Sequence, residues 1–504
     1  MVNLEQLVLP LIGVRDLLTG PDLSADKRVF VNRSINLADI SWIGFDLDDT
    51  LAVYRHERLD TLIVDALIDR MRQQGFPTRL SRMQVDTSFA VRGLVIDTRA
   101  GDLLKVTRCG KVVRGYHGHT PLTSAQLHAR GRESVCARDS KRYAELTTLW
   151  SLCEACVFAA LVQESDQAGE RVDYQKLFRY LRTCLMQLYV DGDLARGWLS
   201  NLAHYVRCDD SLASMLHNLR SSGKKLFLLT NSDRQHVEAV MSLLVGNAMS
   251  EYPTWQHYFD VVVMSAQKPG FFSRVDVDGD QSPESRRGLS PLVNSERNMV
   301  FQAGNVRALE RILGVRGSRV LFIGDHLVED VEAPQKSSAW RTMMIVPELE
   351  QDLRAQLACQ HDLRRLASLD EQQRELEDEL RSYRLDYKEQ ERQVDSARLV
   401  CNDVLAAAAE LERLRVKRSL SQVRRILRQV SSEIAQIEQR YARQCHAVWG
   451  SPFRDGLELT SFGNRLRLSA CLYSSAVTNL LAYSPAHHFR ACRGSLMHDF
   501  CFQF

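Results

Sequence analysis

Three short apolar runs, each followed at once by small polar or acidic residues, are the clearest pattern along the chain. They span residues 42–45, 225–229 and 320–323, and a fourth run spans residues 258–264. Short apolar runs bounded by turn signals are typical of strands buried in a parallel sheet, and ligands bind where the carboxyl ends of such strands meet the following loops. The pattern therefore predicts an α/β core with a doubly wound, Rossmann-like parallel sheet.

The first two predicted strands are separated by residues 46–224, far more chain than an ordinary crossover needs. An inserted domain is therefore expected. Residues 92–97 and 103–106 predict a β-hairpin around residues 99–102, and residues 143–202 carry apolar side chains at helical spacing. We expect this insertion to form a mixed α+β cap.

Residues 363–446 contain no proline or glycine, and their charged residues alternate with Leu, Val and Ile at helical spacing. This predicts long helices in an antiparallel coiled-coil hairpin. A solvated arm is the first interpretation and self-association the second. Nucleic-acid binding by the Arg-rich face of residues 413–428 is the third, because the acidic run at residues 371–379 accompanies it. The predicted domains are 1–55 and 216–362 for the two parts of the core, 56–215 for the cap, 363–446 for the arm and 447–504 for a C-terminal segment packed on the core.

Composition narrows the classes of function. The 504 residues are 45% hydrophobic and carry a formal net charge of +2, so no global field recruits nucleic acid. No stretch approaches the roughly twenty apolar residues that a membrane-spanning helix needs. The chain starts without the basic leader of a signal peptide, and twelve cysteines in a chain of this length indicate reduced thiols. We expect a cytoplasmic protein with neither a membrane nor a nucleic-acid partner.

Two carboxylates follow the first predicted strand. Asp46 and Asp48 share one face of the chain because they are two residues apart, so both can reach one phosphorus atom. We expect Asp46 to attack as the nucleophile, and Asp48 to protonate the leaving oxygen and later to take a proton from water. These roles need opposite protonation states. A bound Mg²⁺ would lower the pKa of Asp46, and apolar surroundings would raise the pKa of Asp48.

The other predicted strands supply the remaining needs of phosphoryl transfer. Thr230 offers a hydroxyl and the N–H groups of a predicted helix start, and Lys268 offers a positive charge. Asp325 offers a hard oxygen ligand for Mg²⁺, and Asp330 could orient the lysine or metal-bound water. Each fragment alone is more often a turn, a helix cap or a surface residue. Their order behind predicted strands favours a phosphoryl-transfer site.

In chain order these elements resemble the haloacid-dehalogenase (HAD) superfamily of aspartate-nucleophile phosphatases. Longer blocks resemble the cytosolic purine 5′-nucleotidase family, whose substrates are of the IMP and GMP type. The blocks are residues 45–54, 92–98, 230–233, 268–272, 323–326, 340–342, 346–349, 450–454 and 472–483. The resemblance therefore covers most of the chain.

The resemblance implies a Mg²⁺-dependent 5′-nucleotidase that hydrolyses nucleoside 5′-monophosphates, transfers phosphoryl groups to nucleosides and assembles as a homo-oligomer. It implies catalytic roles for Asp46, Asp48, Thr230 and Lys268. It implies phosphate binding by Thr230, Asn231, Ser232 and Lys268. It also implies metal binding by Asp46, Asp325 and the backbone carbonyl of Asp48, with Asp330 in a supporting role.

The cap matches the family less closely. Trp150 stands where an aromatic residue stacks on the base, and Arg182 stands where an arginine reads the purine. Where the family has Asp, His and Lys, this chain has Met186, Tyr189 and Ala195. A core role for Trp150 and a solvated position for Arg182 are open alternatives. Two other functions also stay open: a HAD phosphatase acting on another phosphomonoester, and a regulatory or scaffold protein with little activity.

Overall fold

The computed structural model describes most of the chain. The described residues are 23–76, 85–132, 141–169, 171–246, 248–274, 289–294 and 299–491, without the side chains of residues 195 and 290–294. They belong to two units, Met1–Glu350 with Pro452–Phe504, and Gln351–Ser451. The nine cysteines of the described part are free thiols. In that same part no helix combines the length and the apolar character needed to cross a membrane.

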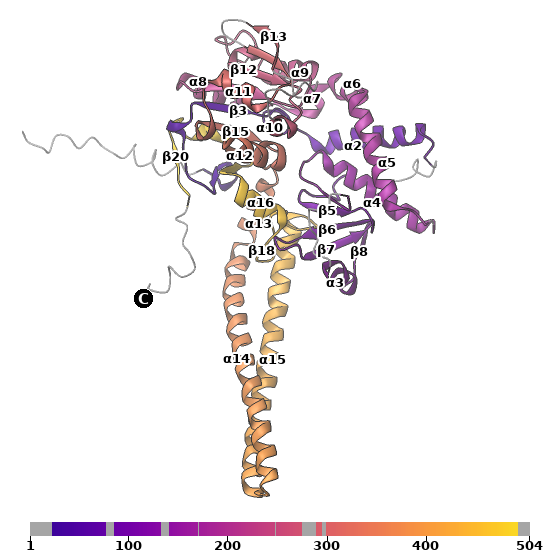
Figure 1. Cartoon of the computed structure of the whole chain (residues 1–504), viewed down its shortest axis with the longest axis vertical. Helices are drawn as coiled ribbons and strands as arrows, with labels where there is room; N and C mark the ends of the chain where they lie inside the picture. The colour runs from indigo at the N-terminus through magenta and orange to yellow at the C-terminus, as the bar shows by residue number, and fades with distance from the viewer. Residues whose placement is uncertain are drawn as a thin grey trace, which may run out of the picture. The chain divides into compact units, whose positions relative to one another are not determined.

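The first unit is built on a mixed sheet of nine described strands (Figure 1). Across the sheet they are β1 (Phe30–Val31), β19 (Leu472–Ser474), β16 (Arg341–Ile345), β15 (Val320–Gly324), β3 (Trp42–Phe45), β11 (Lys225–Leu229), β12 (Val261–Met264), β14 (Met299–Gln302) and β13 (Ser290–Asn294). The two edge strands β1 and β13 pair antiparallel, and all other neighbours pair in parallel. The predicted α/β core with a parallel sheet is confirmed.

The strand that precedes Asp46 lies in the middle of this sheet. β3 pairs with β11 on one side and with β15 on the other, so the chain reverses its direction of travel across the sheet at this point. Such a switch point opens a crevice at the carboxyl ends of the strands. Three of the four predicted strands are found at their predicted positions. The fourth is shorter than predicted, because Trp255–Tyr258 forms a 3-10 turn behind Thr254 and β12 begins only at Val261.

A glycine in β3 makes room for the core of the sheet. The ring of Phe227, from β11, lies where a side chain at Gly44 would be, since a Cβ there would stand 2.1 Å from its Cζ atom. Phe227 stacks on Phe322 of β15 with ring centroids 6.0 Å apart, and Trp340 packs against both rings. Close packing of this kind fixes the three central strands relative to one another. The helices and turns of the core are α8 (Ser211–Ser221), α9 (Arg234–Val245), α10 (Gly270–Ser273), α11 (Val306–Leu313), α12 (Ala333–Ser338), α16 (Ser461–Ser469) and the π-helical turn Leu327–Glu332. Helix α13 (Leu349–Ala358) begins in this unit, and its residues from Gln351 onward belong to the second unit.

The insertion after β3 forms a mixed α+β cap, as predicted. Its antiparallel sheet runs in the order β8 (Thr120–Pro121), β7 (Val112–His117), β6 (Asp102–Val106), β5 (Leu94–Asp97) and β9 (Tyr143–Glu145). Its helices are α2 (His56–Gln73), α3 (Ser124–Arg132), α4 (Ser151–Gln167), α5 (Tyr174–Val190), α6 (Asp193–Leu199) and α7 (Leu202–Tyr205). The predicted hairpin is confirmed as β5 and β6. The prediction of helix from residue 143 is wrong at its start, because residues 143–145 pair with β5.

Short strand pairs complete the first unit. β4 (Val53–Tyr54) pairs with β10 (Val206–Arg207), so the two ends of the insertion leave and re-enter the core side by side. The remaining pairs are β2 (Ile35–Asn36) with β20 (His488–Phe489) and β17 (Arg454–Asp455) with β18 (Glu458–Leu459). The pairing of β4 with β10 places the first residues of α2 directly beside the end of β3.

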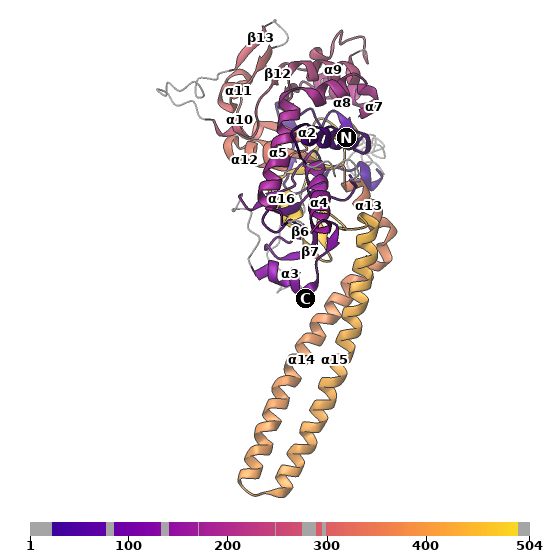
Figure 2. The same ribbon diagram turned by 90° about the vertical axis from the view of Figure 1, so that its right-hand side faces the viewer.

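The second unit is a helical hairpin. Helices α14 (Gln360–Leu399) and α15 (Asp403–Cys445) run side by side in both views (Figure 2). Apolar side chains at helical spacing fill the seam between the two helices. They are Leu366, Leu369, Leu376 and Leu380 of α14 and Leu420, Val423, Val430 and Ile437 of α15. The predicted pair of long antiparallel helices is confirmed.

Candidate active site

Three adjacent strand ends bring the predicted catalytic residues together. Asp46 follows β3, Thr230 follows β11 and Asp325 follows β15. The backbone N–H of Asp46 still belongs to the sheet, since it donates to the carbonyl of Ile323 at 2.8 Å. Asp46 is 8% exposed and Asp325 5% exposed. Both carboxylates are therefore held on rigid backbone in a largely desolvated position.

Lys268 links two of the carboxylates. Its Nζ lies 2.8 Å from Oδ1 of Asp46 and 2.5 Å from Oδ1 of Asp330. Burial lowers the pKa of this lysine, but the charges of Asp330 and Asp46 outweigh burial and raise the pKa above its usual value. Lys268 is therefore a fixed positive charge beside the predicted nucleophile.

The carboxylates of Asp46, Asp325 and Asp330 form a cluster in which one oxygen of each lies within 4.8 Å of the others. Burial raises the pKa of Asp46, with Lys268 opposing and Asp330 and Asp48 adding to the rise. Burial also raises the pKa of Asp325. The cluster thus holds more negative charge than Lys268 alone can balance.

The surroundings of this cluster fit a hard divalent cation. Arg92 approaches Asp325 Oδ2 only to 3.8 Å, since its guanidinium donates to both carboxylate oxygens of Glu348 and to the Asp325 carbonyl. Asp330 already accepts hydrogen bonds at both oxygens, from Lys268 and from the N–H of His326 at 3.1 Å. Asp46 and Asp325 are therefore the carboxylates best placed to hold a metal ion, as carboxylate oxygens hold Mg²⁺.

Asp48 occupies different surroundings from those predicted. Its Oδ1 accepts a hydrogen bond from the Tyr54 hydroxyl at 2.6 Å and lies 2.9 Å from His236 Nε2, and its Oδ2 accepts from Ser232 Oγ. Burial raises the pKa of Asp48, but His236 and the three hydrogen bonds outweigh burial and lower it to about 2. The predicted upward shift is therefore wrong, because the side chains that meet Asp48 are donors and not apolar groups.

The loop after β11 holds these residues in place. The amide of Asn231 donates from Nδ2 to the Lys268 carbonyl at 3.1 Å and accepts from the Lys268 N–H at 2.6 Å. The buried Thr230 accepts from the N–H of Ser232 at its hydroxyl, at 3.1 Å. Asp233 caps α9 through the N–H of His236. The predicted phosphate-binding residues thus lie beside Asp48 and Lys268, and their hydrogen bonds position both.

The two predicted base-contacting residues differ in their surroundings. Trp150 lies in an aromatic cluster, with ring centroids 5.5 Å from Tyr54 and 5.5 Å from Trp198, so it adjoins the residue that hydrogen-bonds Asp48. Arg182 instead donates from Nε and Nη2 to the two oxygens of the buried Glu154, both at 2.8 Å. The aromatic cluster places Trp150 next to Asp48 and its partners, whereas the guanidinium of Arg182 is hydrogen-bonded to Glu154.

The three residues that depart from the family pattern differ in their surroundings. Met186 is 55% exposed on α5. Tyr189 packs against Trp150 with ring centroids 6.3 Å apart. The side chain of Ala195 lies outside the described part of the structure.

Sequence reasoning missed several residues of the site. Tyr54 and Arg92 fall inside the blocks that carry the family resemblance, so their chain positions offered a signal. His236 offered none, because only the folding of α9 against β4 brings it within 3.1 Å of Tyr54. Asp49, in contrast, is visible in the sequence as an extra carboxylate directly after Asp48, and in the structure it has a φ of +53° and places its Oδ1 2.8 Å from His56 Nε2. Its buried Oδ2 has no hydrogen-bond partner among the described residues.

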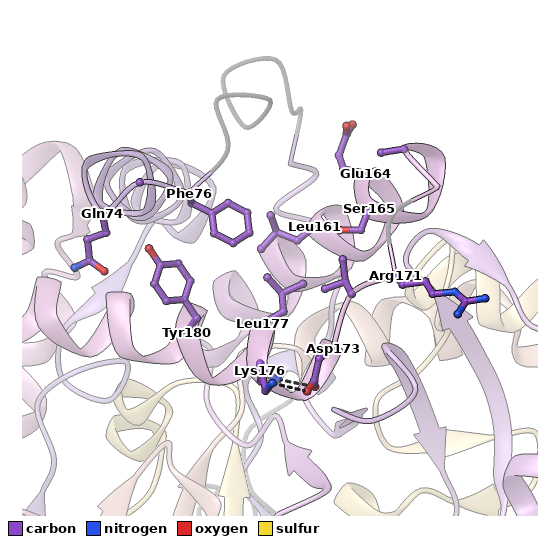
Figure 3. Close-up of a pocket in the computed structure, with 13 residues that line it drawn as sticks. Gln74, Phe76, Leu161, Glu164, Ser165, Arg171, Asp173, Lys176, Leu177 and Tyr180 are labelled. Atoms are coloured by element: carbon purple, nitrogen blue, oxygen red, sulfur yellow. Dashed lines mark hydrogen bonds and ion pairs between the residues drawn. The ribbon is translucent and has the colours of Figure 1, made fainter.

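A hollow of about 590 Å³ lies on the cap, away from these groups (Figure 3). The chain after α2 lines one side of it, and α4 and α5 line the other sides, with Phe76 and Tyr180 stacked 5.5 Å apart. None of the residues around Asp46 and Asp48 lines this hollow. It is therefore separate from the carboxylate site.

Comparison with known proteins assigns the family. A model of the 5′ nucleotidase family matches residues 29–501. The chain belongs to the 5′ nucleotidase family. A 5′-nucleotidase domain-containing protein of Dictyostelium discoideum is 27% identical over 484 residues, which cover 94% of this chain and 75% of that protein. Members of this family are phosphoric monoester hydrolases, and the predicted enzyme class is confirmed.

Among solved structures, similarity is found to a predicted phosphoglycolate phosphatase from Haemophilus somnus 129pt, at a TM-score of 0.27 and 14% identity. It is also found to a 2-haloacid dehalogenase from Pseudomonas syringae pv. Tomato DC3000, at a TM-score of 0.22 and 15% identity. Each alignment covers 61% of this chain, and it covers 86% of the first structure and 87% of the second. The assignment of the chain rests on the match to the family and not on these low TM-scores.

Proposed function

We propose that this chain is a Mg²⁺-dependent 5′-nucleotidase that hydrolyses nucleoside 5′-monophosphates through an aspartyl-phosphate on Asp46. One observation carries the proposal: at the end of β3, Asp46 lies 2.8 Å from the fixed charge of Lys268, and one of its carboxylate oxygens lies within 4.8 Å of an oxygen of Asp325. A nucleophile, a countercharge and a hard oxygen ligand at one point are what phosphoryl transfer requires.

In the first step a carboxylate oxygen of Asp46 attacks phosphorus, and the bond from phosphorus to the 5′ oxygen breaks. Lys268 balances the negative charge of the phosphoryl oxygens. The leaving 5′ oxygen takes a proton from Asp48, and the nucleoside departs as an alcohol. Water then attacks the aspartyl-phosphate and gives a proton back to Asp48, which releases inorganic phosphate and restores Asp46.

The proton for the first step comes from His236 in this proposal. Asp48 is ionised in the resting site, since its pKa is lowered to about 2. Burial lowers the pKa of His236, but Asp48 outweighs burial and raises it above its usual value. A proton on Nε2 of His236 can pass to Asp48 over 2.9 Å as negative charge develops on the leaving oxygen, and the proton that Asp48 later takes from water returns to Nε2 of His236.

Mg²⁺ would be held by Asp46, Asp325 and the backbone carbonyl of Asp48, and it would supply positive charge to the phosphoryl oxygens. Asp330 would act in support, by fixing Lys268. We place the reaction in the cytoplasm, in keeping with the free thiols of the described cysteines.

A purine of the IMP or GMP type is the first proposed substrate, with phosphoryl transfer to nucleosides as a second activity. Support comes from Trp150, whose ring adjoins Tyr54 next to Asp48. The alternative is another phosphomonoester. It is favoured by the engagement of Arg182 with Glu154 and by the exposed, apolar Met186 on the same helix.

Release of phosphate from a panel of 5′-mononucleotides and other phosphomonoesters tests the proposal. With Mg²⁺ we expect turnover, and with Asp46→Asn or a metal chelator we expect a loss of at least about a thousandfold, because the covalent route is closed or the charge is unbalanced. Asp69→Asn is the matched control, since Asp69 is exposed on α2 and pairs only with Arg72 among described residues.

The outcomes separate the alternatives. If no substrate turns over above Asp46→Asn, the enzymatic proposal fails and a regulatory or scaffold role replaces it. If sugar or pyrimidine phosphates are the better substrates, only the purine assignment fails. Trapping a phosphorylated protein that is absent in Asp46→Asn would support the covalent route.

A further inference from the structure

Arg92 is a buried cation that the proposed reaction does not use. It belongs to the cap insertion, two residues before β5, and its side chain is fully buried. The ring of Phe462 lies against the guanidinium, with its centroid 5.5 Å from Cζ. A buried guanidinium must be paired with acceptors, because an unpaired charge is costly away from water. The acceptors that Arg92 finds therefore affect the charge of the site.

Glu348 binds one edge of the Arg92 guanidinium. Nε of Arg92 donates to Oε1 of Glu348 at 2.7 Å, and Nη2 donates to Oε2. Two parallel hydrogen bonds of this kind fix both the position and the orientation of a guanidinium. Glu348 lies between β16 and α13, and 22% of its side chain is exposed. The pair therefore joins a residue of the cap to a residue of the core.

Asp325 lies at the other edge of the guanidinium. Nη1 of Arg92 donates to the backbone carbonyl of Asp325 at 3.0 Å, and it lies 3.8 Å from Oδ2 of the same residue. The second distance is too long for a hydrogen bond, which needs roughly 3.2 Å or less. A shift of less than about 1 Å would close this gap. Arg92 is thus close to the predicted metal ligand but does not bind its carboxylate.

The carboxylate of Asp325 is left without a donor. Within the described part of the chain no group donates a hydrogen bond to it, whereas Asp46 and Asp330 both contact Lys268. Asp325 is nevertheless buried. A buried carboxylate without donors is open to a divalent cation, and it is equally open to a guanidinium. The two cations would compete for the same oxygens.

We propose that Glu348 is a positioning residue of the metal site. By binding one edge of Arg92, it keeps the guanidinium off the carboxylate of Asp325 and leaves that carboxylate to the metal ion. This inference rests on the Mg²⁺ site of the proposed function, and Glu348 acts in it only through Arg92. Without Glu348, the buried guanidinium would take the carboxylate of Asp325 as its partner.

A simpler effect of Glu348 must be separated from this one. Any carboxylate near the site attracts a cation through its own charge. That attraction does not depend on Arg92, whereas the positioning effect exists only when the guanidinium is present. A double-mutant cycle distinguishes the two effects, because residues that act through each other are non-additive.

Binding of Mn²⁺ alone to the metal-free, full-length chain is the measurement, with electron paramagnetic resonance reporting the free ion. Mn²⁺ prefers the same oxygen ligands as Mg²⁺. Glu348→Gln keeps the size of the side chain, but it removes the charge and turns an NH₂ donor toward Arg92. In the chain with Arg92 the dissociation constant should rise by about tenfold to a hundredfold. In the Arg92→Gln background the same substitution should change it by less than about twofold.

Glu145→Gln is the matched control. The carboxylate of Glu145 also pairs with an arginine, Arg465, and its side chain is 23% exposed, close to the value for Glu348. This control should change the dissociation constant of Mn²⁺ by less than about twofold. Equal weakening by Glu348→Gln in both backgrounds, no weakening in either, or equal weakening in the control would each overturn the proposal.

A crystal structure of the metal-free Glu348→Gln chain is a second test, which does not need Arg92→Gln to fold. Nη1 of Arg92 should then lie about 3 Å from Oδ2 of Asp325. A distance still near 3.8 Å would overturn the proposal.

Neither measurement needs turnover, so the role of Glu348 and the proposed reaction can fail separately. A chain that shows the expected Mn²⁺ binding but hydrolyses no nucleotide would support the role of Glu348 and contradict only the reaction. A wild-type chain that binds no Mn²⁺ would overturn both.

Discussion

Asp46 and Asp48 lie two residues apart, yet they meet opposite surroundings. Burial raises the pKa of Asp46, Lys268 opposes this rise, and the charges of Asp330 and Asp48 add to it. Asp48 is met by Tyr54, Ser232 and His236, three donors from two separate segments of the chain, and its pKa falls to about 2. The Asp-x-Asp spacing predicted that both side chains share one face of the chain. Their protonation depends on residues that the motif does not contain.

His117 in the cap offers a test of such tertiary pairing. Its Nδ1 lies 2.8 Å from the buried Asp102, and its Nε2 lies 2.8 Å from Asp166. The hydrogen bond to Asp102 is the main cause that raises the pKa of His117 in the folded state, and burial opposes it. The pair therefore stabilises the fold fully below the unfolded pKa of about 6.5, and this contribution is lost as pH rises through the folded pKa.

The variant His117→Gln should lose this contribution. We expect the difference in unfolding free energy between wild type and variant to be larger at about pH 5.5 than at about pH 9. Urea unfolding at the two pH values measures it. His128→Gln, at an exposed position of α3, is the control and should show no such trend. A difference that grows with pH would contradict the assignment of a protonated His117.

At the scale of elements, the central strand shows what a single small residue decides. Gly44 sits between the neighbouring strands, and its missing side chain leaves the space that the ring of Phe227 fills. The apolar run at 42–45 predicted the strand but not this contact, since Phe227 lies far away in sequence. The position of Asp46 depends on how β3 packs here.

Gly44→Ala should therefore destabilise the core. A Cβ would stand between 2.1 and 2.6 Å from three ring atoms of Phe227, so either β3 or the ring must move. We expect a loss of about 3 kcal/mol in unfolding free energy. Gly131→Ala, in α3 with nothing within 4 Å, is the control and should be neutral or stabilising by up to about 1 kcal/mol. Equal behaviour of the two variants in thermal unfolding would refute the packing argument.

Long elements were predicted from the sequence better than short ones. The long helices of the hairpin follow from an uninterrupted helical period without glycine or proline, which is a strong local signal. The short strand β9 carries no such signal, because its three residues become a strand only by pairing with β5. Short elements are decided by their neighbours, and long periodic ones by their own sequence.

At the scale of the whole molecule, the chemistry and the hairpin belong to different units. Asp46, Lys268, Asp325 and Asp330 all lie in the unit formed by Met1–Glu350 and Pro452–Phe504. Replacing residues 363–444 by a short Gly-Ser linker should therefore leave the phosphate-release rate within about twofold of the full chain, because no group of the site is removed.

The measurement is kcat on the best substrate of the panel, together with the mass in solution. The shortened chain should be active, and its mass in solution shows whether the arm mediates self-association. A large loss of activity in a folded, shortened protein would show that the hairpin supports the site. An unchanged oligomeric state would contradict assembly through the arm.

The sequence by itself determined the sheet, the two long helices and the identity of the carboxylates and the lysine at the strand ends. These features rest on local periodicity and on motifs that follow buried strands, both of which are written in consecutive residues. Only the tertiary structure decided that His236 and Tyr54 ionise Asp48, that Glu154 engages Arg182, and that Asn231 holds Lys268. The physical reason is that a buried charge responds to whichever groups the fold brings within a few ångströms, and those groups are distant in the chain.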